Sequence, residues 1–205
     1  AKVELEIVED MTVAALFGDF VHDALSIHPD AGSTIEWLGG LLFTDPRLSD
    51  IGARAILPIN SLEITLNDEG FTATTFEEYD TLRLSFGLPD SSRDMQVDKS
   101  ILLEVGFEEL NGVDFNKGCY VGQELTARTK HRGLIKKRLV PMAFDGSPPQ
   151  TGSEITQDGK NAGELRSVGT TTALALMRLE ALENSAPLLA DGITLIPQKP
   201  NWANF

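Results

Sequence analysis

Short runs in which apolar and polar residues alternate are spread along the chain. The first lies in residues 2–8, Lys-Val-Glu-Leu-Glu-Ile-Val, and its period of two is typical of a half-buried β-strand. Similar runs between turn residues predict further strands at 13–17, 34–43 (interrupted by Gly39-Gly40), 53–57 and 62–66. Short helices are predicted at 18–28 and 101–110. This mixture indicates an α+β protein.

One longer helix is predicted at residues 75–86. Thr75 followed by Glu78 forms a capping box, and Gly87 followed by Leu88-Pro89 ends the helix. Apolar residues recur within it at spacings of three and four, which predicts one buried face. That face consists of Phe76, Tyr79, Leu82 and Phe86.

The pattern changes near residue 139. Strands are predicted at 139–144, 154–156, 163–167 and 192–197, and residues 172–179 could form a strand or a helix. Asp158-Gly159 between two of these strands is a hairpin signal. Several short strands with glycine-rich turns indicate a small barrel or sandwich. We therefore predict two domains, an α+β region at 1–139 and a C-terminal β-barrel at 140–205.

Composition and charge narrow the possible functions. The chain has 205 residues, 41% of them hydrophobic, and no apolar stretch approaches the 18 residues of a membrane span. The net charge is −14, yet residues 117–138, called the basic segment below, hold seven Lys/Arg and one acidic residue. The basic segment thus carries +6 and the other 183 residues −20. It could receive a polyanion or could be a solvated segment paired with acidic neighbours.

Within the basic segment lies the run Lys117-Gly118-Cys119-Tyr120-Val121-Gly122-Gln123-Glu124, which contains the only cysteine. Good helix formers at 123–130 predict that this run leads into a helix N-terminus. The helix dipole and Lys117 would both favour the thiolate, although a lone cysteine is more often a buried apolar residue. The three histidines are scattered and identify no protease-like partner. They are His22, His28 and His131.

This run closely resembles the K-G-C-Y-x-G-Q-E signature of the YgfZ family, folate-binding proteins similar to the T-protein of the glycine cleavage system. Supporting elements match along nearly the whole chain. They are Asp45-Pro46-Arg47 with Gly52 and Arg54, Arg83 with Gly87-Leu88-Pro89, Gly112-Val113-Asp114-Phe115, and Gly163-Glu164-Leu165-Arg166-Ser167. The resemblance implies an antiparallel, ferredoxin-like sheet-and-helix region followed by a small C-terminal barrel, around a folate-sized channel.

The resemblance also implies a function. YgfZ-like proteins bind tetrahydrofolate and support assembly or repair of iron–sulfur enzymes, including radical-SAM enzymes that thiolate tRNA or make lipoate. Cys119 would be the key functional residue. The folate would be bound by Lys117, Tyr120, Gln123, Glu124, Arg128 and also Arg132. We expect iron–sulfur client or assembly proteins as partners, tRNA only as an indirect partner, and no membrane. We also expect no tightly held metal, because one cysteine cannot hold a cluster alone.

Several alternatives stay open. The family has a segment before the equivalent of Ala1, so we expect this chain to be the later part of a longer protein. An aminomethyltransferase of the T-protein type and an RNA-binding module that uses the basic segment are the competing functions. We expect an accessory factor rather than a turnover enzyme. The lone cysteine and the absence of a signal-peptide pattern are consistent with the cytoplasm.

Overall fold

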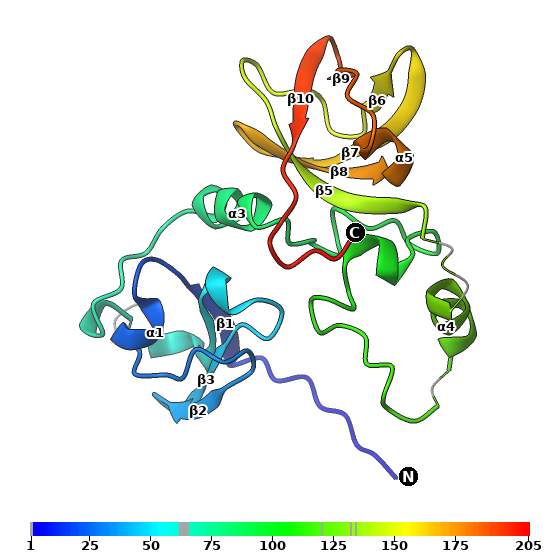
Figure 1. The fold of residues 1–205 in the computed structure, drawn as a ribbon. Coiled ribbons are helices and arrows are strands. Elements are labelled where there is room, and N and C mark those ends of the chain that lie inside the picture. The colour runs from blue at the N-terminus through cyan, green and yellow to red at the C-terminus, as the bar shows by residue number, and fades with distance from the viewer. Residues whose placement is uncertain (1, 62–65, 120, 132, 134) are drawn as a thin grey trace. The chain divides into compact units, whose positions relative to one another are not determined.

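The computed structural model describes residues 2–61, 66–119, 121–131, 133 and 135–205. The chain divides into two compact units, Ala1–Tyr79 and Asp80–Phe205, each with its own hydrophobic core. The first unit contains one antiparallel sheet and the second contains a closed barrel. The predicted α+β architecture with a C-terminal barrel is confirmed (Figure 1).

The sheet of the first unit has the strand order β1-β4-β3-β2, with every neighbouring pair antiparallel. Its strands are β1 (Met11–Leu16), β2 (Thr34–Trp37), β3 (Gly40–Thr44) and β4 (Ala53–Pro58). The predicted interruption at Gly39-Gly40 is a tight turn between β2 and β3, in which Leu38 and Gly39 both have positive φ. Gly40 itself is required by packing, because an added Cβ would lie 1.9 Å from the carbonyl oxygen of Ile56.

Burial alternates along β4, as a strand with one face on a core requires. Ala53, Ala55 and Leu57 of that strand are buried, and they pack in one cluster with Leu16 and Leu42. The 3-10 turns η1 (Ser49–Ile51) and η2 (Ile59–Ser61) flank β4.

Two predictions in this unit are wrong. Residues 2–8 form no strand: their apolar side chains are exposed, and no described strand pairs with them, so the alternating pattern has no core to face. The helix predicted at 18–28 is reduced to one turn, α1 (Val21–Ala24), which Phe20 precedes in a left-handed conformation that helix interiors exclude. The strand predicted at 62–66 lies, apart from Leu66, outside the described residues.

The longer predicted helix is α3 (Phe76–Ser85), which contains the division between the two units. One half of the predicted capping box is confirmed at its start, where the Thr75 hydroxyl accepts a 3.3 Å hydrogen bond from the Glu78 amide. The predicted apolar face is only partly buried: Tyr79, Leu82 and Phe86 are half-buried, and Phe76 is 59% exposed. The fully buried residues are Arg83 and Leu84, because the polar network around Arg83 holds that side inward.

The barrel of the second unit closes in the order β10-β5-β8-β7-β6-β9. Its strands are β5 (Lys137–Ala143), β6 (Glu154–Gln157), β7 (Lys160–Val168), β8 (Thr172–Arg178), β9 (Leu188–Ala190) and β10 (Ile193–Pro197). The predicted hairpin at Asp158-Gly159 is confirmed, since both residues have the positive φ of a type I′ turn. Residues 172–178 form a strand rather than a helix. The pattern missed β9 and the one-turn helix α5 (Leu179–Leu182).

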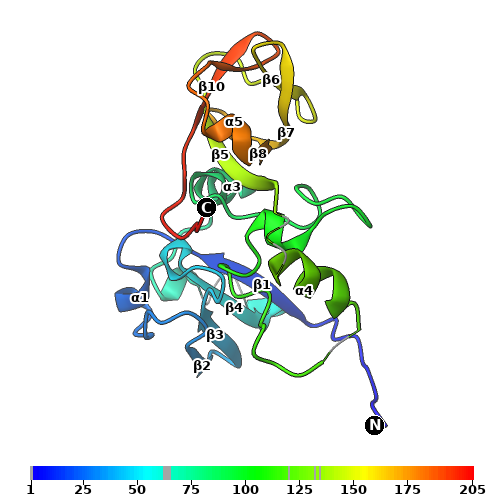
Figure 2. The same cartoon turned by 45° about the vertical axis from the view of Figure 1, so that its right-hand side comes forward.

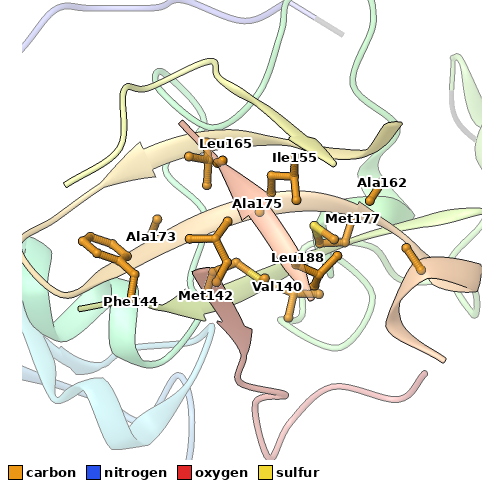
Figure 3. Packing of buried hydrophobic residues seen from close by; sticks show 13 residues of the cluster. Val140, Met142, Phe144, Ile155, Ala162, Leu165, Ala173, Ala175, Met177 and Leu188 are labelled. Atoms are coloured by element: carbon orange, nitrogen blue, oxygen red, sulfur yellow. The ribbon is translucent and has the colours of Figure 1, made fainter. Parts of the chain in front are cut away.

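The barrel interior is filled by apolar side chains from several strands. Met142 of β5, Leu165 of β7 and Met177 of β8 are fully buried and lie in one cluster with Ala175 and Leu188 (Figure 3). Gly163 faces Met177 so closely that an added Cβ would lie 2.7 Å from its sulfur. The barrel is therefore a packed core rather than a channel.

A polar network surrounds Asp94, between α3 and the barrel. Asp94 is buried and accepts hydrogen bonds from Arg83 Nη1 (2.7 Å) and from the Asp90 (2.8 Å) and Ser167 (2.9 Å) amides. Arg83 also donates to Asp80 and to the Leu88 carbonyl. The predicted helix 101–110 is only a 3-10 turn, η3 (Leu102–Val105), which Gly106 ends with a positive φ.

Low pH should destabilise the second unit partly through Asp90. Partial burial works against ionisation of Asp90, but hydrogen bonds from the Ser92 hydroxyl and amide and from Arg93 outweigh it and lower the pKa to about 2. The ionised carboxylate therefore stabilises the unit fully above about pH 4, the usual pKa of an aspartate in an unfolded chain. This contribution is lost as the pH falls through 2.

Urea unfolding between pH 5 and 2 tests this, with Asp90→Asn compared against Asp145→Asn, an exposed carboxylate of the same unit. The free energy of unfolding should fall less steeply with acid in Asp90→Asn only. Parallel profiles for all three proteins would contradict the assignment.

Candidate functional site

The described residues of the signature before α4, 117–119 and 121–122, lie in an exposed loop of the second unit. Cys119 is exposed, and its neighbour Gly118 has no heavy atom within 4 Å of the position that a Cβ would occupy. Gly122 is equally open and has a φ of +86°, which favours glycine. The open backbone leaves the thiol accessible to a large partner. Tyr120, which lies between these residues, is outside the described part of the chain.

The loop leads directly into helix α4 (Gln123–His131), as predicted. The start of this helix follows Cys119 by four residues, and Gly122 with its positive φ turns the chain into it. A helix N-terminus carries partial positive charge, which favours an anion such as a thiolate nearby.

Contacts on one side of α4 fix its orientation. Thr129 is buried, and its hydroxyl donates a 2.9 Å hydrogen bond to the Leu125 carbonyl. Lys130 Nζ donates to both oxygens of Glu108 (2.5 and 2.7 Å) and lies 5.5 Å from the ring centre of Phe115. The helix accordingly lies beside the segment that contains η3 (Figure 2).

The acidic residues upstream of the signature pair with the basic segment. Besides the Glu108–Lys130 pair, Glu109 forms a 3.0 Å ion pair with Arg138, and both of these side chains are more than nine-tenths buried. Arg138 also donates to the Leu103 carbonyl at 2.8 Å. These contacts agree with the alternative that the basic segment pairs with acidic neighbours.

The residues predicted to bind folate lie on this loop and the first two turns of α4. Lys117 and Glu124 are exposed, and Gln123 is half-buried. Arg128 forms a 2.5 Å ion pair with Glu124, one helical turn earlier. The structure thus brings Glu124 and Arg128 together, while Arg132 lies outside the described residues.

Within residues 2–61, 66–119, 121–131, 133 and 135–205, no group of three or more His, Cys, Asp or Glu side chains is placed to hold a metal ion. In the same residues, no helix has the length and apolar character that crossing a membrane requires.

The first unit contains a groove that the sequence did not predict. Its volume is about 830 Å³, and it is lined by parts of β1, α1 and residues 66–79, among them Phe17, Phe71 and Tyr79. The Tyr79 hydroxyl accepts hydrogen bonds from Arg47 (3.2 Å) and Arg54 (3.4 Å). No local motif marks the groove, because its walls come from segments far apart in the sequence.

The same two arginines hold a buried carboxylate. Asp45 accepts hydrogen bonds from Arg47 and Arg54 at 2.8 Å each. Burial raises the pKa of Asp45, but hydrogen bonds and charge from Arg47, with a contribution from Arg54, outweigh burial and leave the pKa below its usual value. The Asp-Pro-Arg stretch noted in the sequence therefore forms a structural ion-pair cluster.

Comparison with known proteins shows which proteins this chain resembles. The model of the CAF17 C-terminal β-barrel domain matches residues 136–205. Human mitochondrial iron–sulfur cluster assembly factor IBA57 is 30% identical over 187 residues, which are 87% of this chain and 50% of that protein. The mouse protein of the same name is 33% identical over 149 residues, 70% of this chain and 41% of that protein.

The chain is thus similar to the IBA57 proteins over most of its length. The predicted resemblance to the YgfZ family is confirmed by this similarity. The chain spans about half or less of the length of the curated relatives described here.

A solved structure extends the comparison of the fold. Glycine cleavage system aminomethyltransferase T from Bartonella henselae aligns with a TM-score of 0.66 over 85% of this chain and 53% of that chain. At 16% sequence identity this likeness concerns the fold alone, and it confirms the predicted T-protein-like architecture of this chain.

Proposed function

We propose that this protein supports the assembly or repair of iron–sulfur clusters in client enzymes, with Cys119 as the residue that contacts the cluster. The observation that carries the proposal is the exposed thiol at the start of α4, on a chain related to proteins named iron–sulfur cluster assembly factors. Thiolates are the usual ligands of iron–sulfur clusters. An exposed one can reach a cluster that another protein presents.

The number of thiols indicates how the protein would act on a cluster. A cluster is usually held by four protein ligands, and this chain supplies one cysteine. Cys119 would therefore share the cluster with a partner for a limited time, which is the chemistry of transfer or repair rather than of a scaffold.

Cells that lack the protein test this function. We expect the activity of [4Fe–4S] enzymes, including the radical-SAM enzymes that make lipoate or thiolate tRNA, to fall and to return when the full-length protein is supplied. Unchanged activity of these enzymes in the deletion strain would contradict the proposal. Restored activity without restored cluster content would do the same.

We also propose that the full-length protein binds tetrahydrofolate with the anionic tail on the basic segment. The exposure of Lys117 and Arg128 suits an anionic glutamate tail, although Glu124 already pairs with Arg128. Folate supplies one-carbon chemistry when bound, and these residues would only orient it. Gln123 and Tyr120 stay predicted contacts.

Calorimetry with tetrahydrofolate should show weaker binding by Lys117→Ala and Arg128→Ala than by the wild-type full-length protein. Lys160→Ala, an exposed lysine of the barrel, serves as the control. Equal affinities of the wild type and all three variants would contradict binding of the folate tail by the basic segment.

The cytoplasmic location predicted from the sequence stays a proposal. A reducing compartment keeps an exposed thiol available, and the IBA57 relatives compared above are named as mitochondrial proteins.

A further inference from the structure

Two apolar side chains next to Cys119 face away from the protein. Val121 is 104% exposed relative to an extended reference, and Leu125 in the first turn of α4 is 63% exposed. Val121 lies in the turn that precedes α4, and Leu125 lies in the first turn of that helix. Glu124 and Arg128, both exposed, form an ion pair on the same helix. The surface formed by Val121, Leu125, Glu124 and Arg128 is called the α4 face below.

The α4 face cannot turn inward without breaking contacts. The second half of the helix, where Thr129 is buried, is tied to the protein by the Lys130–Glu108 ion pair. Exposed apolar surface costs roughly 25 cal/mol per Å² relative to its burial. Because Val121, Leu125 and an exposed cysteine occur together on an open backbone, the α4 face has the character of a protein contact.

The charge around the α4 face specifies the partner. The basic segment carries +6 in a chain of net charge −14, and Arg128, Lys130 and Lys136 are exposed. A second copy of this chain could contact the α4 face either with its own α4 face or with its acidic remainder. Two α4 faces would repel each other, because both are basic. A separate protein with an apolar pocket and an acidic rim would match both features.

We propose that Val121 and Leu125 anchor a cluster-free client protein, whose acidic-rimmed apolar pocket receives them and thereby brings its cluster site to Cys119. This inference rests on the proposed function and adds to it a docking step that does not require the thiol. The surrounding cations steer the encounter, and the two apolar side chains set the lifetime of the complex.

The experiment measures binding of the full-length protein to a purified, cluster-free, lipoate-forming radical-SAM enzyme by biolayer interferometry. The double variant Val121→Ser/Leu125→Ser should bind roughly tenfold more weakly or worse, mostly through faster dissociation. Val97→Ser is the matched control, since Val97 is 86% exposed in a loop of the same unit. It should bind like the wild type.

Circular dichroism and urea unfolding should be unchanged in the double variant, because both side chains are exposed. Equal affinity of wild type and double variant would overturn the inference, and so would undetectable binding by the wild type. If the double variant lost binding to purified tRNA but still bound the radical-SAM enzyme like the wild type, the α4 face would be assigned to RNA instead. If the wild type restores client activity while the double variant binds normally, the docking inference fails and the proposed function stands.

Discussion

Asp94→Ala should unfold the second unit at much lower urea concentrations than the wild type. Asp94 is fully buried and accepts three hydrogen bonds, from the Arg83 guanidinium and from the amides of Asp90 and Ser167. Removal of the carboxylate leaves a buried cation short of a partner and two amides unpaired. Breaking a buried pair in this way costs about 3–5 kcal/mol of unfolding free energy.

The fluorescence of Trp202 reports this loss, because its indole donates a 2.7 Å hydrogen bond to the Phe86 carbonyl within the second unit. A Trp37→Phe background removes the other tryptophan of the chain. Asp145→Ala, at an exposed position, should change the unfolding free energy by less than about 0.5 kcal/mol. A similarly small effect of Asp94→Ala would show that the network adds little to stability.

Cys119→Ser should abolish the support of client enzymes and leave the fold intact. Serine keeps the size of the side chain and replaces the thiolate by a hydroxyl, which is a poor cluster ligand. The side chain is exposed, so the unfolding free energy should stay within about 0.5 kcal/mol of the wild type. Asn116→Ser, an exposed position of the same loop, is the control and should retain activity.

Local patterns predicted elements whose signals are themselves local. The Asp158-Gly159 hairpin, the Thr75 cap and the start of α4 each depend on a few adjacent residues, and all three are confirmed. Residues 2–8 show the limit of such reasoning. The alternation of apolar and polar residues indicates which side chains a strand would bury. Whether a strand forms depends on a neighbouring strand to pair with, and the local pattern does not specify one.

The α3 helix shows a second limit. Periodicity predicted an apolar face on which only Phe76 is exposed, but it did not predict the burial of Arg83, which pairs with Asp94 eleven residues away. A buried ion pair reverses the usual rule that charged residues face water. For the same reason, the one-turn helix α5 and the three-residue strand β9 were missed, since tertiary contacts rather than sequence period define them.

For the site, the sequence identified the segment but not its contacts. The signature predicted Cys119 before a helix, and the residue is exposed there. Pairing of Glu108 and Glu109 with Lys130 and Arg138 joins residues more than twenty positions apart. The groove of the first unit likewise requires the three-dimensional arrangement of β1, α1 and residues 66–79. The domain boundary predicted at residue 140 stays a prediction, and the barrel strands begin at Lys137.

The most direct test of the central claim is the [4Fe–4S] content of a lipoate-forming radical-SAM enzyme purified from cells that lack this protein. These cells should be supplied with the full-length wild type, Cys119→Ser or Asn116→Ser at equal protein levels. The account predicts restored cluster content with the wild type and with Asn116→Ser, and content as low as in the deletion strain with Cys119→Ser. Full restoration by Cys119→Ser would contradict it.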